Sequence, residues 1–406
     1  MRLVPIVFRF MESRVGSPFW RHFTHIYEWW EERRSRWRMR RQAAAQAGRS
    51  DAPLAERFCK RPFESFELQE NGSVNLCCPT WLRTRAGNLH ADDATAIWNS
   101  SQAQAVRAGI HDGSFRHCNH AICPDIQAGT LPLRREVERE PRWRDIIQKK
   151  ITAMPGVPAF INLSNDKSCN LACPSCRTER IQFNGGPGYE ARLALQKKLE
   201  AAFFAHPTDQ DMLVSVTGSG DPFASRVFRD FLFALDASKF PRLSVNLQTN
   251  GTLFTEKTWN NMAKLHGHIG SVLVSLDAAS AATYAVVRRG GDWPQLLENL
   301  DFLAGLRRSG KIRELILYFV VQRANFHEMP EFARIGKRLN ADRITFQRAV
   351  NWGTWSRGEY AAQAVWDPGH PDHAAFARVM ADPILADPAV FLGNLAQARL
   401  APPVAA

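Results

Sequence analysis

Several features are absent from this sequence of 406 residues. No apolar run approaches the roughly 20 residues that a membrane-spanning helix needs, so the sequence predicts no such helix. The N-terminal apolar run is short and is interrupted by Arg9 and Glu12, so we expect no secretory signal. Residues 1–50 contain no lysine and no aspartate, and the last 230 residues contain no cysteine. A charged content of 23% is ordinary for a globular protein, and this length indicates two or three domains.

Over half of the net charge lies at one end of the chain. Residues 1–50, with 11 Arg and 4 Glu, form a basic arm and linker that carries +7 of the total of +12. Ser17 as a cap, Pro18 and aromatic residues at helical spacing predict a helix over 17–45. Such a helix can lie on an anionic membrane or dock a partner, or it can pack its aromatic face on its own protein. Because this arm accounts for more than half of the net charge, the basic pI is weak evidence for nucleic-acid binding, and we expect no nucleic-acid partner.

The eight cysteines fall into two groups, which favours metal ligation in a reducing cytoplasm over a disulfide framework. The second group, Cys169, Cys173 and Cys176, has the spacing C-x3-C-x2-C and follows the apolar run 159–163. A strand that ends in a short loop can direct three thiolates to one point. That is one thiolate fewer than a fully ligated [4Fe-4S] cluster takes, so one iron would stay open. A partial zinc knuckle or three unrelated buried cysteines are the alternatives.

The first group of cysteines lies in a predicted module over residues 55–133. Strand-like runs flank an Asn-Gly turn at 70–72, which is typical of a hairpin. This hairpin brings Cys59 and Cys77 to the same end, and a predicted helix over 96–110 then leads to the pair Cys118 and Cys123. Four cysteines can ligate a complete cluster or a zinc ion, with the neighbouring histidines more often at the surface than among the ligands.

From residue 159 to 350, predicted strands and helices alternate, which implies right-handed βαβ units and a parallel sheet. The predicted strands are 160–163, 212–216, 243–247, 272–276, 315–321 and 343–346. Six units, not eight, predict an α/β fold with a partial (β/α)6 TIM-like barrel, whose site lies at the carboxyl ends of the strands. Residues 134–158 form a linker, and the tail 351–406 can cover the open end of the barrel.

The three-cysteine loop resembles the defining motif of the radical S-adenosylmethionine (SAM) superfamily, and the later strand ends resemble its SPASM/twitch subgroup. The module at 55–133 resembles the twitch domain, the short relative of the SPASM domain, here placed N-terminal to the core. The resemblance implies a [4Fe-4S] cluster whose open iron binds SAM, and an auxiliary cluster, expected to be [4Fe-4S]. The implied metal ligands are Cys169, Cys173 and Cys176 for the first, and Cys59, Cys77, Cys118 and Cys123 for the second. Cys78 is left over, or it replaces Cys77.

The resemblance also implies a set of SAM-contacting residues at the strand ends. They are Gly218, Ser219, Gly220, Asp221, Thr249, Asn250, Ser275, Asp277, Arg288 and Gln322. Asp221 would accept from the SAM ammonium, Arg288 would pair with its carboxylate, and Asp277 would accept from the ribose. Gln322 and Asn325 either face the pocket or cap the following helix. The sequence departs from the family at Ser175, where an aromatic residue commonly packs near the adenine.

The resemblance implies an enzyme that cleaves SAM reductively to a 5'-deoxyadenosyl radical and abstracts a substrate hydrogen. We expect oxidation of the substrate radical with the help of the auxiliary cluster, hence an oxidoreductase or maturase. One alternative is an epimerase in which Cys78 returns a hydrogen atom. An alternative of another class is a non-catalytic zinc or iron-sulfur binding protein. The expected substrate is a peptide, a sugar or another small molecule, and the expected electron donor is a flavodoxin or ferredoxin.

Overall fold

The computed structural model describes residues 53–216 and 219–396, so the predicted helix over 17–45 lies outside the described residues. The described chain divides into two compact units. The first contains residues 53–65, 74–88 and 96–156, and the second contains the remainder, including the short segments 66–73 and 89–95. No helix of the described residues is long and apolar enough to cross a membrane.

The second unit is built on a sheet with the strand order β10-β9-β8-β7-β6-β5-β4-β1. Its strands are β1 (Ser65–Gln69), β4 (Phe160–Ser164), β5 (Met212–Val216), β6 (Leu243–Thr249), β7 (Ile269–Ser275), β8 (Glu314–Val321), β9 (Arg343–Arg348) and β10 (Val390–Phe391). Each pair from β4 to β9 is parallel. The predicted α/β fold with six parallel core strands is therefore confirmed, and the tail adds β10, parallel to β9.

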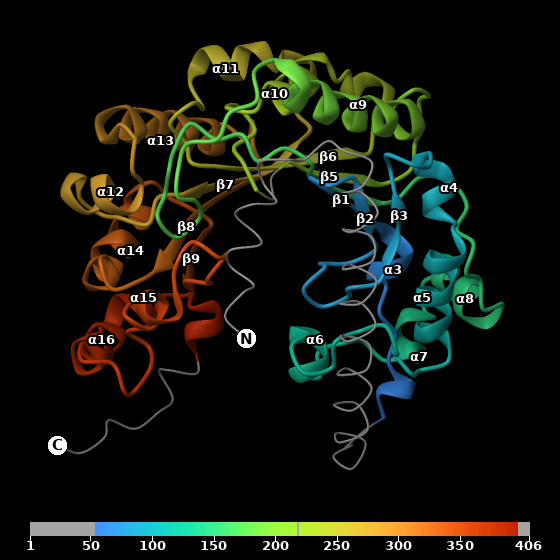
Figure 1. The fold of residues 1–406 in the computed structure, drawn as a ribbon, viewed down its shortest axis with the longest axis horizontal. Helices are drawn as coiled ribbons and strands as arrows, with labels where there is room; N and C mark the ends of the chain where they lie inside the picture. The colour runs from blue at the N-terminus through green and yellow to red at the C-terminus, as the bar shows by residue number, and fades with distance from the viewer. Residues whose placement is uncertain (1–52, 217–218, 397–406) are drawn as a thin grey trace, which may run out of the picture. The chain divides into compact units, whose positions relative to one another are not determined.

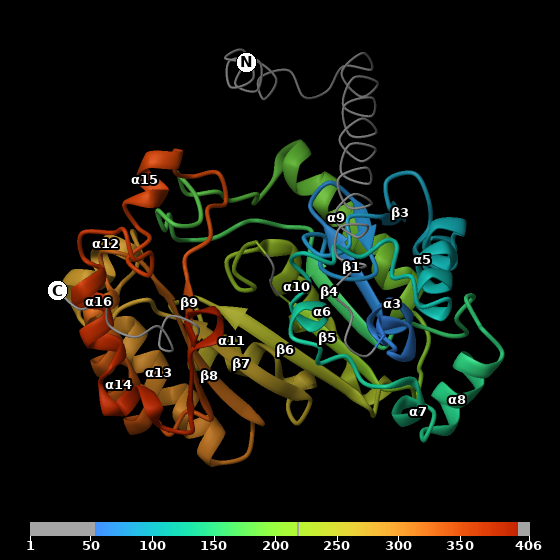
Figure 2. The same ribbon diagram turned by 90° about the horizontal axis from the view of Figure 1, so that it is seen from below.

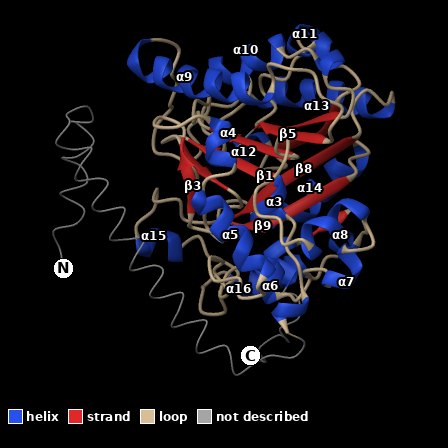
Figure 3. Ribbon diagram, turned by 90° about the vertical axis from the view of Figure 1, so that its right-hand side faces the viewer, coloured by secondary structure: helices blue, strands red, loops and turns tan. Residues whose placement is uncertain are grey.

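Helices cover one face of this sheet, which is why its strands are rich in buried apolar residues. They are α9 (Gly186–Phe203), α10 (Arg226–Ala234), α11 (Glu256–Asn261), α12 (Ala281–Val287), α13 (Trp293–Arg308) and α14 (Met329–Arg338), with the short turns η2 (Ala237–Lys239), η3 (Ala263–Leu265) and η4 (Phe326–Glu328). In Figure 1 these helices lie outside the strands, and Figure 3 shows the same layering from the side. Because these pairs are parallel, the carboxyl ends of β4–β9 lie along one edge of the sheet. Figure 2 shows β6, β7 and β8 side by side in this sheet.

The tail packs against the last strands and helices of the core. Its elements are α15 (Arg357–Ala361), α16 (His373–Met380), η5 (Pro383–Ala386), β10 and η6 (Gly393–Leu395). Phe376 contacts Phe326, and the Ile344 N–H donates to Ala389 O at 2.8 Å. Covering of the open end of the barrel stays a prediction.

The first unit is small and mostly helical. Its elements are η1 (Leu54–Glu56), α3 (Arg61–Glu64), β2 (Ser73–Asn75), β3 (Arg85–Asn88), α4 (Ala94–Trp98), α5 (Ser101–His111), α6 (Pro124–Gln127), α7 (Arg134–Val137) and α8 (Pro141–Gln148). The fully buried Arg107 donates to three backbone carbonyls, those of Pro62 (2.9 Å), Trp98 (2.8 Å) and Thr152 (2.7 Å). One guanidinium thus ties together segments far apart in sequence.

The structure divides the chain differently from the predicted module at 55–133. Residues 66–73 and 89–95 group with the core, because their contacts go there. Phe66 packs edge-on against Phe203, and Lys198 Nζ donates to Leu89 O at 2.8 Å. The linker 134–158 folds as α7 and α8 and groups with the first unit.

Candidate iron-sulfur sites

The three cysteines of the core lie in the loop that follows β4. Cys169 and Cys173 are buried, whereas Cys176 is exposed. Backbone hydrogen bonds close the loop, from Cys169 N to Ile181 O at 2.8 Å and from Cys176 N to Cys173 O at 2.9 Å. A closed loop at the carboxyl end of a parallel strand is where the sequence predicted the three-thiolate site.

Each of these sulfurs accepts a hydrogen bond from a nitrogen-bearing side chain. The donors are Asn250 Nδ2 to Cys169 (3.7 Å), Arg288 Nη1 to Cys173 (3.7 Å) and Arg177 Nη2 to Cys176 (3.5 Å). Burial raises the pKa of the Cys169 thiol to about 11 and also raises that of Cys173, so both sulfurs need a cation to become thiolates near neutral pH. Buried thiols surrounded by N–H donors fit an iron-sulfur cluster.

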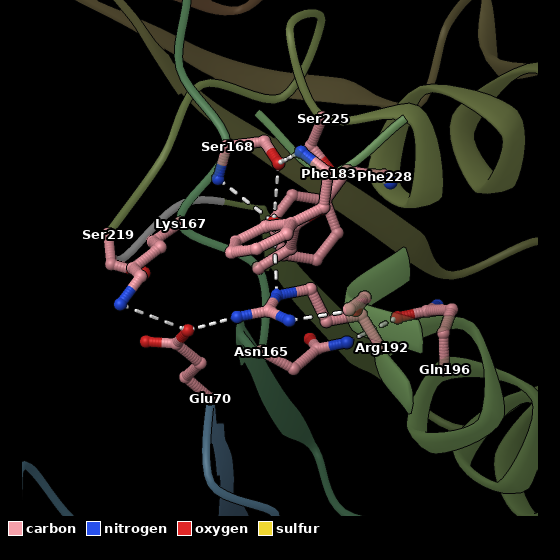
Figure 4. Close-up of polar contacts among 12 residues, drawn as sticks. Glu70, Asn165, Lys167, Ser168, Phe183, Arg192, Gln196, Ser219, Ser225 and Phe228 are labelled. Carbon is pink, nitrogen blue, oxygen red and sulfur yellow. Dashed lines mark hydrogen bonds and ion pairs between the residues drawn. The ribbon is translucent and has the colours of Figure 1, made fainter. Parts of the chain in front are cut away.

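A buried carboxylate, Asp166, supports the cysteine loop from below. One carboxylate oxygen accepts from Ser168 N (2.9 Å) and Ser168 Oγ (2.8 Å), and the other accepts from Ser225 Oγ (2.7 Å) at the start of α10. Arg192 of α9 lies 3.5 Å from it as an ion pair. Figure 4 shows Ser168, Ser225 and Arg192 converging from three elements. Asp166 therefore holds the residue next to Cys169 against two helices.

Arg192 extends this support to β1 and to the far end of the cysteine loop. Its guanidinium stacks on Phe183, 3.5 Å from the ring centroid, and pairs with Glu70, which also lies 3.3 Å from Lys167 Nζ (Figure 4). Ser168 Oγ in turn accepts from Phe183 N at 2.9 Å. Both ends of the loop are thus fixed by one charged cluster.

The predicted Gly-Ser-Gly-Asp turn after β5 packs directly on the cysteine loop, with Gly218 outside the described residues. A Cβ on Gly220 would lie 2.5 Å from Ser168 O and 2.8 Å from Asp166 O, so only glycine fits. The Asp221 carboxylate accepts four hydrogen bonds from the protein, which come from Phe223 N (3.0 Å), Ala224 N (3.2 Å), Thr249 Oγ1 (2.7 Å) and Asn250 N (2.8 Å). Asp221 joins this turn to the end of β6, and its contact with SAM stays a prediction.

The predicted turn after β6 also contacts the cysteine loop. Besides its bond to Cys169, Asn250 donates to Asn170 Oδ1 at 2.9 Å, and Asn170 donates to Thr252 Oγ1 at 2.8 Å. Gly251 has φ +81°, the left-handed conformation that glycine favours. Thr249 and Asn250 are therefore engaged with the protein, one with Asp221 and the other with the cysteine loop.

The stretch after β7 places Asp277 and Arg288 together. Arg288 Nη2 lies 2.8 Å from Asp277 Oδ2, whose other oxygen accepts from Val320 N at 2.7 Å. Asp277 has φ +59°, an uncommon conformation for a residue other than glycine. The carboxylate predicted to accept from the ribose therefore pairs with the arginine predicted to bind the SAM carboxylate, while the predicted contact Ser275 is buried at the end of β7.

The two residues considered after β8, Gln322 and Asn325, differ in their partners, and Asn325 makes no capping hydrogen bond with its side chain. Asn325 is structural, because it accepts from Gln322 N (2.8 Å) and donates to Asp277 O (2.8 Å) and Val320 O (3.0 Å). Gln322 keeps a buried Nε2 without a partner among the described residues, as do Arg288 Nε and Ser219 Oγ. Three predicted SAM contacts thus carry unpartnered buried polar atoms, which fits a polar ligand.

In the first unit, one pocket is lined by Cys59, Cys77, Cys118 and Cys123. Burial raises the pKa of Cys59 to about 11. Burial also raises the pKa of Cys118 well above its usual value, and repulsion from Cys59, Cys77 and Cys123 adds to that shift. The predicted set is therefore brought together. Among the described residues, no three Cys, His, Asp or Glu side chains converge closely enough for a single metal ion, whereas a cubane binds each thiolate to a different iron.

The residues beside this pocket are otherwise engaged. His117 Nδ1 lies 3.1 Å from Thr84 Oγ1, and His120 Nε2 lies 3.0 Å from Phe115 O. Cys78, which is partly exposed, is not among the residues that line the pocket. In the tail, His370 and His373 contact the backbone oxygens of Ala362 (3.1 Å) and Val365 (3.0 Å).

Sequence reasoning missed two residues at the core site, Asp166 and Arg177. Asp166 is a single carboxylate three positions before Cys169, and its partners Arg192 and Ser225 lie 26 and 59 residues further on. Arg177 follows Cys176 directly, so adjacency to the motif was a usable signal for it.

Comparison with known families assigns both regions. Residues 167–334 match the radical SAM superfamily, and residues 59–124 match an iron-sulfur cluster-binding domain, SPASM. The two matches support an enzyme of the radical SAM and SPASM type, with a [4Fe-4S] cluster, SAM and an auxiliary iron-sulfur cluster as cofactors. The SPASM match precedes the radical SAM match in the chain, and the twitch-type assignment stays a prediction. A comparison with curated proteins found no match.

Solved structures give more distant similarities. SuiB from Streptococcus suis is 14% identical, with 82% of this chain and 70% of that chain covered and a TM-score of 0.39. SuiB bound to the precursor peptide SuiA is 15% identical, with 71% of this chain and 62% of that chain covered and a TM-score of 0.36. The structure of anSMEcpe with AdoMet and the Cp18Cys peptide is 20% identical, with 54% of this chain and 57% of that chain covered and a TM-score of 0.36. The last two show that this chain spans about three fifths of those proteins, and at such TM-scores the similarities carry no argument about function.

Proposed function

We propose that this chain is a radical SAM oxidoreductase that abstracts a hydrogen atom from its substrate and oxidises the resulting radical. The observation that carries the proposal is the three-cysteine loop, which has an N–H donor at every sulfur. Near it, Ser219, Arg288 and Gln322 each have a buried polar atom without a partner in the part of the chain that the structure describes. Three thiolates for a four-iron cluster leave room for a ligand that those atoms can bind.

In this proposal Cys169, Cys173 and Cys176 hold the cleaving cluster. When bound, the cluster and SAM together supply reductive cleavage of the sulfonium and the radical that follows. Arg288, fixed by Asp277, keeps its Nε for an anionic group such as a carboxylate. Gln322 offers an amide N–H from the end of β8, and Asn250 orients Cys169. Asp221 acts by fixing the turn that carries Ser219 and Gly220.

The four cysteines of the first unit would hold the auxiliary cluster. Their set is complete, so its irons have no open position, and outer-sphere electron transfer is the chemistry this favours. Oxidation by this cluster predicts one SAM consumed for each oxidised product. SAM regenerated at every turnover contradicts that assignment.

Cleavage itself is tested on the anaerobically reconstituted chain with dithionite and SAM. We expect 5'-deoxyadenosine to form, and about eight irons per chain from two four-iron clusters. Intact SAM in the presence of a reduced cluster overturns the proposal. Zinc in place of iron at either site would instead favour the non-catalytic binding protein.

One observation keeps the epimerase in view. Cys78 is partly exposed and lies outside the four-cysteine pocket, so its thiol is left over for hydrogen donation. An epimerase predicts that Cys78→Ala abolishes product while 5'-deoxyadenosine still forms. Under oxidation, Cys78→Ala keeps product formation. The substrate as a peptide, sugar or small molecule, and a flavodoxin or ferredoxin as donor, remain part of the proposal.

A further inference from the structure

The cysteine loop contains a buried arginine whose charge no carboxylate balances. Arg177 is 8% exposed. Nη1 donates to Lys167 O at 2.7 Å, and Nη2 donates to Ser219 O and to Cys176 Sγ. In the described part of the chain, no acidic side chain pairs with it.

The other buried guanidiniums of this region are balanced. Arg288 pairs with Asp277 at 2.8 Å, and Arg192 pairs with Asp166 and Glu70. A buried cation without a counter-charge is costly, so an anion is expected beside it. The three cysteine sulfurs would provide that negative charge as thiolate ligands of a cluster, and Cys176 Sγ lies 3.5 Å from Arg177 Nη2.

A fixed cation beside a cluster acts on its reduction. Each electron that a cluster takes up makes it more negative by one charge, and a buried positive charge stabilises that state more than water would. Net charge and hydrogen bonds to sulfur are among the levers that set iron-sulfur potentials. Arg177 supplies both at Cys176, whereas the charge of Arg288 is already cancelled by Asp277.

We propose that Arg177 is a positioning residue that raises the reduction potential of the cleaving cluster through its positive charge, which no carboxylate of the described residues pairs with, and through its hydrogen bond to Cys176. The inference rests on the proposed function, because it requires a cluster on the three-cysteine loop. It differs from the SAM contacts, since the donors of Arg177 are used within the loop and on Ser219 O.

The test is a potentiometric titration of reconstituted full-length protein, followed by EPR of the reduced cluster. The cleaving cluster is the one whose signal changes when SAM is added. Arg177→Gln and Arg177→Met are expected to make reduction at least about tenfold less favourable, equal to 59 mV for one electron. Arg177→Lys keeps the charge, and it is expected to change the equilibrium constant for reduction by less than about threefold, which equals 28 mV. Arg289→Gln is the matched control, because Arg289 is exposed and its side chain donates to Ala172 O (3.1 Å) of the same loop and not to a cysteine sulfur of the described residues.

The outcomes separate this inference from the proposed function. Unchanged potentials in the neutral variants overturn the role of Arg177 and leave the function standing. A tenfold shift in Arg177→Lys, or one of equal size in Arg289→Gln, also contradicts it. Loss of the SAM-sensitive signal from the neutral variants, with Arg177→Lys retaining it, supports a requirement for positive charge. Wild-type protein without any SAM-sensitive signal overturns the proposed function itself.

Discussion

The two cysteine sites differ in what surrounds their sulfurs. The core loop has three cysteines among Asn250, Arg177 and Arg288, and nearby Ser219, Gln322 and Arg288 each carry an unpartnered buried polar atom. The pocket of the first unit has four cysteines, and its other lining residues are mostly apolar, with Arg61 and Asp125 as the charged ones. Among the described residues, none that lines this pocket carries an unpartnered buried polar atom.

That difference explains how iron-sulfur clusters can serve two purposes in one chain, electron transfer and ligand binding. A complete set of thiolates in apolar surroundings excludes water and further ligands, which suits electron storage or transfer. An incomplete set among polar donors provides for a small polar ligand at the missing position. The number of sulfurs and the presence or absence of unpartnered polar atoms are independent observations. At the core loop both favour ligand binding, and at the four-cysteine pocket both favour electron transfer.

The largest expected effect comes from removing one sulfur at each site. Cys169→Ala is expected to lose about four irons per chain and to abolish 5'-deoxyadenosine formation. Cys118→Ala is expected to lose a similar number of irons while SAM cleavage continues and substrate oxidation stops. Iron analysis and chromatography of the nucleoside measure both. If Cys118→Ala also abolished cleavage in a folded protein, the division of labour between the sites would be wrong.

The next effect concerns the buried carboxylate of Asp166, which supports the core loop. Asp166→Ala is expected to lower the free energy of unfolding by about 3 kcal/mol, because it removes a buried, hydrogen-bonded carboxylate from Arg192 and Ser225. Urea denaturation of the iron-free chain measures it. Asp230→Ala is the control, since Asp230 is 51% exposed and forms long ion pairs with Arg226 and Arg229, both at 3.6 Å, and about 1 kcal/mol or less is expected there. Equal losses would deny Asp166 a special role.

The strands of the core were predicted from the sequence more accurately than the short helices. Strands β4–β9 follow from apolar runs separated by amphipathic helices, and the predicted 212–216 matches β5 at both ends. The seven-residue α12 was not predicted, because Ala281 and Ala282 open it without an apolar periodicity. The predicted helix at 96–110 is two helices, broken at Asn99 and Ser100, where Ser100 Oγ caps α5 by accepting from Ala103 N at 3.1 Å.

At the site, spacing identified positions but not the partners of each side chain. The cysteines are recognisable because their chemistry requires three at short intervals. Asp221 and Asp277 were assigned to the ligand by motif, yet their carboxylates receive protein donors from other strand ends. Whether a buried charge such as Arg177 is balanced depends on contacts between distant segments, which no local pattern encodes.

A smaller effect is expected from the close approach of the two loops at the core site. Gly220→Ala is expected to cost about 1–3 kcal/mol of folding free energy, because its Cβ would lie 2.5 Å from Ser168 O and the backbone must shift. Thermal denaturation of the iron-free chain gives the change. Gly185→Ala provides the comparison, since nothing lies within 4 Å of its added Cβ. A tolerated alanine at 220 would mean that the turn does not need to touch the cysteine loop.

The smallest expected effect distinguishes neighbouring cysteines of the first unit. Cys78 does not line the four-cysteine pocket, so Cys78→Ala is expected to keep the full iron content and to change stability by less than about 1 kcal/mol. Cys77→Ala removes a sulfur that lines the pocket and repels Cys118, and about four irons should be lost. Iron and sulfide analysis of the two variants, purified side by side, decides between them. The reverse result would make Cys78 the ligand and would require the segment after β2 to turn its other thiol into the pocket.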